Sequence, residues 1–182
     1  GTCLLQHINL GACDVDGIPK AFADGMSELC GLHSTTGVGE SREYLPPEVD
    51  RQVGLGMLGL ANLLRRYGVT YDAFGAALDR VNADITEYTP ADEIARKLRE
   101  GVERAERIAK SHNMVRAFAI APTAFCSYRS SDSDGFTSTP EIAPPISRTV
   151  DRDSGTFGVQ TYEYGDVEIA SEVGWYAYKR VA

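Results

Sequence analysis

The sequence has few cysteines, few histidines and no long apolar run. Its four cysteines, Cys3, Cys13, Cys30 and Cys126, match no zinc-ligand spacing, and the three histidines are scattered, so we expect no metal site. So few cysteines in 182 residues argue against a secreted disulfide scaffold, and we expect reduced thiols in a cytoplasmic setting. No stretch approaches the roughly 20 apolar residues that cross a bilayer. The N-terminal apolar run is interrupted by polar residues, which is atypical of a signal peptide.

Basic residues are also scarce relative to acidic ones. The chain has 18 Lys and Arg against 26 Asp and Glu, which gives a formal net charge of -8. General nucleic-acid binding needs a basic surface that displaces counterions from phosphates, so the composition argues against such a partner. An anionic ligand would have to be held by local backbone N–H groups or by a few arginines, because the overall field repels it.

What the chain contains is enough apolar sequence, 43%, for one domain with a core. We expect strands over residues 3–10, 116–121 and 156–162, helices over residues 21–30, 47–67, 71–86, 90–111 and 168–178, and a loop over residues 122–138 with a mobile turn at 130–135. Strands that alternate with helices predict an α/β architecture.

The clearest predicted helix covers residues 90–111. Thr89 can cap it, and Asp92 completes a Thr-x-x-Asp box. Acidic residues precede basic ones by four positions, as in Glu100 and Arg104, and each such pair contributes a few tenths of a kcal/mol. The charges of this helix therefore need no functional explanation.

Gly54-x-Gly-x-x-Gly59 has the glycine spacing of a dinucleotide-binding loop. That fingerprint follows a strand directly, whereas the residues before Gly54 resemble a helix start. We expect one buried helix over residues 47–67, because its apolar positions cover nearly every face. The glycines are then points where another backbone approaches closely. An NAD-dependent enzyme is the least favoured alternative.

The segment Ile120-Ala-Pro-Thr-Ala-Phe-Cys-Ser127 is the strongest local candidate for ligand binding. A strand that ends in Pro122 and Thr123 exposes successive backbone N–H groups, to which Thr123 and Ser127 add hydroxyl donors. That combination suits phosphate oxygens. From these residues alone, a Ser-rich connector without a ligand is the alternative, and Cys3 alone is typical of a small core residue.

Three motifs in this order resemble the large subunit of ribonucleotide reductase. They are Cys3 with Ile8-Asn-Leu-Gly11, then Arg51-Gln-Val-Gly-Leu-Gly-Met-Leu-Gly-Leu-Ala61 with Gly68-Val-Thr-Tyr71, and finally Ala121-Pro-Thr123. The resemblance implies that residues 1–182 form one partial catalytic domain, the second half of a ten-stranded α/β barrel built from two parallel half-sheets. It implies reduction of ribonucleotides to deoxyribonucleotides by thiyl-radical chemistry.

By this resemblance, Cys3 is one of two thiols that become a disulfide during the reaction. The residues that line the substrate phosphate site would be Pro122, Thr123, Ala124, Phe125, Cys126 and Ser127. Phe125 and Cys126 depart from the family, which has small or hydroxylated residues there.

The resemblance also implies partners. The Asn-x-Cys-x-Glu segment that carries the radical cysteine would precede Gly1, so we expect a fragment or split-gene piece that is inactive without the N-terminal half of the catalytic chain. The whole enzyme would need a radical generator, either a metal-containing small subunit or adenosylcobalamin, and thioredoxin or glutaredoxin as reductant; this segment itself is expected to bind no cofactor. The alternative is a non-catalytic nucleotide-binding, phosphate-binding or interaction module that retains barrel remnants.

Overall fold

Three parallel strands form the centre of the fold in the computed structural model, which describes residues 4–35, 50–121 and 123–182. The strands β1 (Leu4–Asn9), β2 (Gln52–Leu58) and β3 (Arg116–Phe118) pair in chain order, β1 with β2 and β2 with β3. Within the described residues, β1 and β3 each pair along one edge only, and the sheet does not close into a barrel. The predicted α/β architecture is confirmed.

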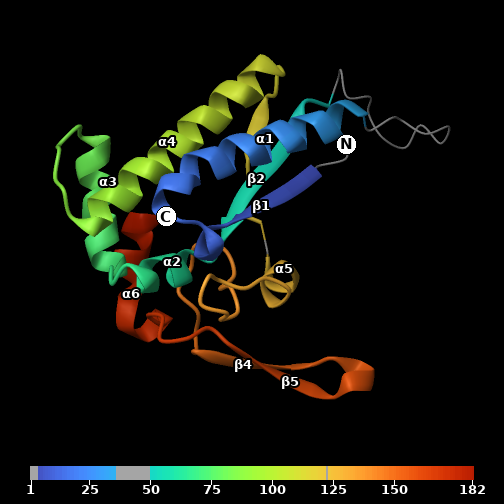
Figure 1. Ribbon diagram of the computed structural model, residues 1–182, viewed down its shortest axis with the longest axis vertical. Coiled ribbons are helices and arrows are strands. Elements are labelled where there is room, and N and C mark those ends of the chain that lie inside the picture. The colour runs from blue at the N-terminus through green and yellow to red at the C-terminus, as the bar shows by residue number, and fades with distance from the viewer. Residues whose placement is uncertain (1–3, 36–49, 122) are drawn as a thin grey trace.

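Helices connect these strands and follow them. They are α1 (Ile18–Thr35), α2 (Leu60–Arg66), α3 (Tyr71–Asn82), α4 (Pro90–Ser111), α5 (Ala124–Tyr128) and α6 (Ala170–Val181). Single 3-10 turns lie at Leu10–Ala12, Val15–Gly17 and Gly155–Phe157. An antiparallel hairpin of β4 (Thr149–Asp153) and β5 (Val159–Glu163) precedes α6 and extends away from the sheet (Figure 1).

α1 and α4 lie side by side on one side of the sheet, whereas α5 and the β4–β5 hairpin lie on the other (Figure 1). The packing leaves no room for larger side chains: a Cβ on Gly25 of α1 would come within 2.7 Å of Ile8 Cδ1. A Cβ on Gly101 of α4 would come within 2.9 Å of the Phe22 ring. α1 therefore packs directly on the sheet, and α4 packs directly on α1. The buried apolar residues of these elements belong to the main core.

The helix predicted over residues 47–67 is wrong in its first half. Gln52–Leu58 is the central strand β2, and only Leu60–Arg66 is helical. A buried parallel strand is apolar on both faces, so its sequence resembles that of a helix buried on all sides. Gly59 separates the two elements with φ of 77°, a left-handed conformation that glycine adopts at little cost.

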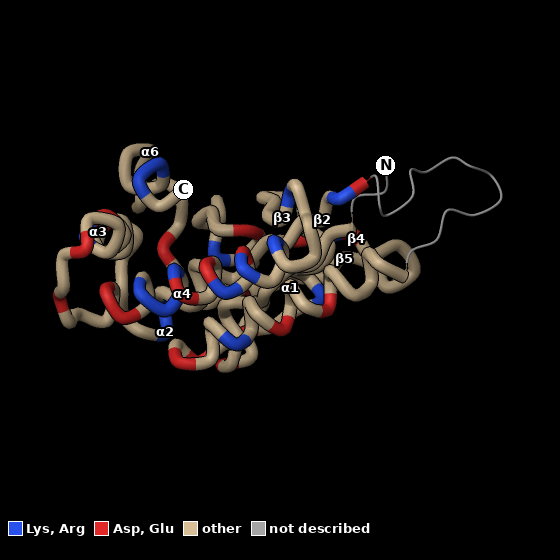
Figure 2. The backbone as a smooth tube through the Cα atoms, turned by 90° about the horizontal axis from the view of Figure 1, so that it is seen from above, with Lys and Arg blue, Asp and Glu red and all other residues tan. Residues whose placement is uncertain are grey.

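The other predicted helices and strands are present, most of them with shifted ends. The strand β4 and the short helix α5 were not predicted. The helix over 90–111 is confirmed to the residue. The expected helix over 21–30 is longer, and the expected strand over 156–162 begins only at Val159. Acidic and basic residues are interspersed along the described helices (Figure 2).

Asp92 joins the start of α4 to α3. Its carboxylate is buried and accepts two hydrogen bonds from Arg80, from Nε and Nη2, each 2.9 Å long. Thr89 caps the helix by accepting the Asp92 N–H, as predicted, and its hydroxyl donates to the same carboxylate. These contacts, led by the hydrogen bond from Arg80, lower the pKa of Asp92 to about 2. Asp92 therefore serves a tertiary contact, whereas the predicted surface pair Glu100–Arg104 is formed on the helix itself.

We predict that Asp92→Asn lowers the free energy of unfolding at pH 7 by about 1–3 kcal/mol, because it weakens a charge-assisted bidentate contact. The folded-state pKa lies below its usual value of 3.8, so this stabilisation is present above about pH 4 and is lost as the pH falls through about 2. Urea unfolding of both proteins at pH 7, 4 and 2 should show the difference shrinking at pH 2. Glu106→Gln, which removes an exposed carboxylate beside Lys110 on the same helix, is the control and should change stability by less than about 1 kcal/mol. A difference that does not depend on pH would contradict the role given to the carboxylate.

Candidate functional site

The segments that follow β1, β2 and β3 meet at one end of the sheet. The Asn9 Nδ2 donates to the Ser131 carbonyl at 3.0 Å, across 122 positions of sequence, and the Ser138 hydroxyl donates to Asn9 Oδ1 at 3.0 Å. The Gly59 N–H donates to the Thr139 carbonyl at 2.7 Å. The carboxyl ends of parallel strands are where open α/β sheets bind ligands, so this end is the candidate site.

The side chain of Asn62 in α2 holds the loop after α5 in place. Its Oδ1 accepts the N–H of Thr139 at 2.7 Å and the hydroxyl of Thr139 at 3.0 Å. Its Nδ2 donates to the Asp132 carboxylate and to the Thr137 carbonyl, each at 3.0 Å. Asn62 is completely buried, so these bonds replace water entirely.

Asp132 extends this network through the turn that follows it. Its Oδ1 accepts the N–H groups of Asp134 and Phe136, each at 2.9 Å, while its Oδ2 accepts from Asn62. The side chain is buried. The expected mobile turn at residues 130–135 is therefore wrong at Asp132, because an Asx-type turn can also be an anchor when a buried donor faces it. The sequence signal for its partner Asn62 was that Asn62 is the single polar residue in the apolar run 60–64.

The candidate phosphate loop forms the first turn of α5. The structure describes all of its predicted residues except Pro122, which lies outside the described residues. Ala124, Phe125 and Cys126 are exposed, and their N–H groups occupy the helix start, where no intrahelical acceptor exists. A phosphate oxygen could accept hydrogen bonds from these groups.

Thr123 and Ser127, the two hydroxyl residues of this loop, are buried and serve its structure. Thr123 Oγ1 accepts the N–H of Glu141 at 2.8 Å, and the Ser127 hydroxyl donates to the Ala124 carbonyl at 2.8 Å. The prediction placed both among the ligand donors. In the structure both hydroxyl groups stabilise the loop. The groups left to contact a ligand are the backbone N–H groups of residues 124–126.

The glycines of β2 bring neighbouring strands close together, as the sequence predicted, although in a strand and not a helix. A Cβ on Gly54 would lie 2.9 Å from Ala119 Cβ, and one on Gly56 would lie 2.7 Å from the Ala119 carbonyl oxygen. Both glycines lie inside the strand, so they cannot form the loop that a dinucleotide requires. This agrees with the interpretation of the motif as a packing feature.

His7 lies on the sheet face opposite α1 and next to Gly56. Its Nε2 is buried and has no hydrogen-bond partner among the described residues. Burial lowers the pKa of His7, and the negative charge of Glu141 opposes that shift. The imidazole is therefore held toward its neutral form near the candidate loop.

The thiols differ in their surroundings. Cys3 lies outside the described residues. Cys13 is half-buried and donates from Sγ to the Asn9 carbonyl at 3.4 Å; burial raises its pKa, and Arg66 opposes the shift. Burial also raises the pKa of Cys30. A raised pKa disfavours the reactive thiolate, so neither is suited to be a nucleophile.

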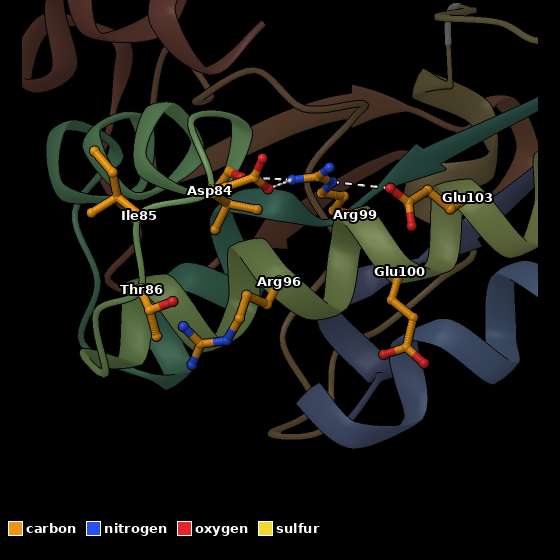
Figure 3. A pocket seen from close by; sticks show the side chains of 8 residues that line it. Asp84, Ile85, Thr86, Arg96, Arg99, Glu100 and Glu103 are labelled. Carbon is orange, nitrogen blue, oxygen red and sulfur yellow. Dashed lines mark hydrogen bonds and ion pairs between the residues drawn. The ribbon is translucent and has the colours of Figure 1, made fainter.

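A separate pocket of 420 Å³ lies between α4 and the turn after α3, away from this site (Figure 3). Arg99 pairs there with Glu103 at 3.0 Å and with Asp84 at 3.5 Å. Arg96 pairs with Glu93 at 2.9 Å, just outside the pocket lining. The arginines of this pocket are thus neutralised by the protein's own carboxylates, and the pocket indicates no anion site.

No group of three or more His, Cys, Asp or Glu side chains within the described ranges is placed to hold a metal ion. Among the helices that the structure describes, none has the length and apolar character needed to cross a bilayer. No protein-family model matches the chain, and a search of curated proteins finds no match. The motifs and the geometry of the site are therefore the only indications of function among the described residues.

We predict that Asn62→Ala lowers the free energy of unfolding by about 3 kcal/mol, because several buried partners lose their hydrogen bonds at once. Hydrogen exchange of the Thr139 amide should accelerate more than that of amides in α4. The control is Asn82→Ala at the exposed end of α3, which should change stability by less than about 0.5 kcal/mol. Similar losses in the two variants would contradict the organising role of Asn62.

Proposed function

We propose that this chain is the second half of the catalytic barrel of a ribonucleotide reductase large chain. In this proposal it contributes one redox-active thiol, Cys3, and the loop that holds the substrate phosphates. The intact enzyme would comprise this chain, the N-terminal half of the barrel with the second thiol and the radical cysteine, a radical generator and a thioredoxin-like reductant.

The observation that supports the proposal is that one residue from each of the three motifs, Asn9, Gly59 and Thr123, lies at the same end of the sheet. Asn9 of the first motif bonds to the loop after α5, and so does Gly59 of the second motif. That loop follows α5, which begins directly after Thr123 of the third motif. Segments that are far apart in sequence thus surround one place, at the strand ends where α/β sheets bind their ligands.

The order of the strands supports a barrel over a doubly wound sheet. In a doubly wound sheet, helices cover both faces and the strand order reverses at the ligand site. Here the order β1-β2-β3 follows the chain, and α1 and α4 lie on the same side (Figure 1). Strands in chain order with helices on the outside are typical of α/β barrels.

The reaction assigns separate tasks to the residues of this chain. The backbone N–H groups of residues 124–126 hold the phosphates and so fix the ribose. Cys3 and the second thiol together supply two electrons and two protons, the ribose 2′-hydroxyl leaves as water, and the two sulfurs become a disulfide. Thiol–disulfide exchange with thioredoxin or glutaredoxin then restores both thiols. A radical generator bound elsewhere supplies the thiyl radical that starts the sequence.

A non-catalytic nucleotide-binding module is the second candidate. A continuous buried core that joins β1, β2, α1, α3 and α4 favours it, because such a core suits a chain that folds alone. A module of this kind binds nucleotide without a complementary chain and shows no turnover when that chain is added.

We predict that Cys126→Glu weakens the binding of cytidine di- and triphosphate at least about tenfold, because a carboxylate enters the site of the phosphates. The helix should tolerate the change, since acidic residues are favourable in a first turn. Cys126→Gln is the neutral control and should bind within about threefold of the wild type. Calorimetric titration of the chain, alone and with the complementary half, measures the affinities. Equal affinities of the Glu and Gln variants would remove this loop from the site.

We predict that Cys3→Ser abolishes multiple turnover in the reconstituted enzyme with thioredoxin as reductant, because no disulfide can form. Cys13→Ser is the matched control, since a serine hydroxyl can donate to the Asn9 carbonyl in place of the thiol. Deoxyribonucleotide formation is measured over several turnovers. If Cys3→Ser turns over like the wild type, the redox role of Cys3 is wrong.

A further inference from the structure

Arg152 in β4 is a half-buried arginine that has no carboxylate partner among the described residues. The other half-buried arginines that the structure describes all pair with an Asp or Glu; they are Arg65, Arg66, Arg80, Arg96 and Arg180. In a chain of net charge -8, carboxylates are plentiful. A half-buried guanidinium that no described carboxylate neutralises is therefore a candidate for binding an anion from outside the chain.

Aromatic rings of α5 and the hairpin hold this guanidinium in place. Its central carbon lies 4.4 Å from the ring centroid of Phe125 and 5.0 Å from that of Tyr128. Tyr162 of β5 contacts the Tyr128 ring, with centroids 4.8 Å apart. Cation–π contacts use the charge of a guanidinium but none of its five N–H donors. The donors of Arg152 therefore remain available to a ligand.

The carboxylates on either side of Arg152 point elsewhere. Asp151 accepts the hydroxyl of Thr161 at 2.6 Å, and Asp153 accepts the N–H of Gly155 at 2.9 Å. Successive residues of a strand face opposite sides, so both carboxylates lie on the outer face of the hairpin and are exposed. The hairpin thus presents its arginine toward α5 and its acids toward solvent.

We propose that Arg152 binds the terminal phosphate of a nucleoside di- or triphosphate at the α5 loop. The assignment rests on the proposed function, because it uses the same phosphate site. Phe125 links the two parts, because its N–H belongs to the loop and its ring contacts the guanidinium. In this assignment the backbone N–H groups hold one phosphate, and the guanidinium fork binds the next phosphate of the chain.

Arg152 places a positive charge beside the phosphate loop of a protein whose net charge is -8. The overall field repels a nucleotide, and the N–H groups of one short turn carry only partial charge. A full positive charge beside them gives selectivity for phosphate number, since a monophosphate has no group that reaches it. Arg152 would thus distinguish di- and triphosphates from monophosphates.

The test compares Arg152→Gln, Arg152→Lys and a control, Arg129→Gln, by calorimetric titration with cytidine mono-, di- and triphosphate. Arg129 follows α5 directly, is exposed and makes no described ring contact, so its loss changes the charge equally. The chain is used alone and with its complementary half. We expect Arg152→Gln to weaken diphosphate binding at least about tenfold and monophosphate binding less than threefold, with Arg152→Lys in between. Arg129→Gln should stay within twofold.

Hydrogen exchange of the hairpin amides separates ligand binding from a purely structural role. Unchanged protection with lost diphosphate selectivity supports the proposal. Equal weakening for mono- and diphosphate, or unchanged affinity in Arg152→Gln, overturns it. If Arg152→Gln and Arg152→Lys both weaken diphosphate binding and both lower the hydrogen-exchange protection of the hairpin amides to the same extent, Arg152 serves hairpin packing. That result also overturns the proposal.

The two proposals fail in different ways. If Cys126→Glu abolishes binding while Arg152→Gln binds normally, the phosphate loop stands and only the role of Arg152 is wrong. If the wild type binds no nucleotide, alone or with its complement, the phosphate site itself is wrong and both proposals fall.

Discussion

The buried amide of Asn62 is the interaction on which the candidate site depends. One side chain satisfies the backbone and hydroxyl of Thr139 on one side and the carboxylate of Asp132 on the other. The loop after α5 has little regular structure of its own, so its shape follows from these bonds. A buried polar network lowers stability when some of its groups lack partners, and it favours one loop conformation when all of them are paired. Here the Asn62 amide uses both its donor and its acceptor atoms.

The charge of the chain sets the second constraint. Carboxylates outnumber basic groups. Most half-buried arginines form ion pairs that join separate elements, as Arg80 of α3 does with Asp92 of α4. Positive charge for an anionic ligand is then scarce and must be placed locally. The aromatic rings of α5 provide such a place for Arg152, because they hold a cation without neutralising it. The paired arginines thus stabilise the fold, whereas Arg152 keeps its charge uncompensated by any described carboxylate.

Sequence reasoning predicted those elements whose signals are local. Thr89 and Asp92 mark the start of α4 through capping chemistry, and the helix begins and ends where predicted. It failed for β2, because an apolar run buried on both faces has no period that separates a strand from a helix. It also missed the partners of Asn62, Asp132 and Arg152, which depend on contacts between distant segments. The candidate loop at residues 122–127 was singled out from its residue types and stays a prediction, but the inward direction of Thr123 followed only from its bond to Glu141.

The unpaired edges of the sheet have a consequence for any solution of the isolated chain. Along β1 and β3 the described residues leave one row of backbone donors and acceptors without a strand partner. Those rows offer the same hydrogen bonds to a second copy as to a complementary chain. In a mixture with the proposed complementary half, self-association would compete with association between the two different chains. The ratio of the two chains, as well as their total concentration, would then set which assembly forms.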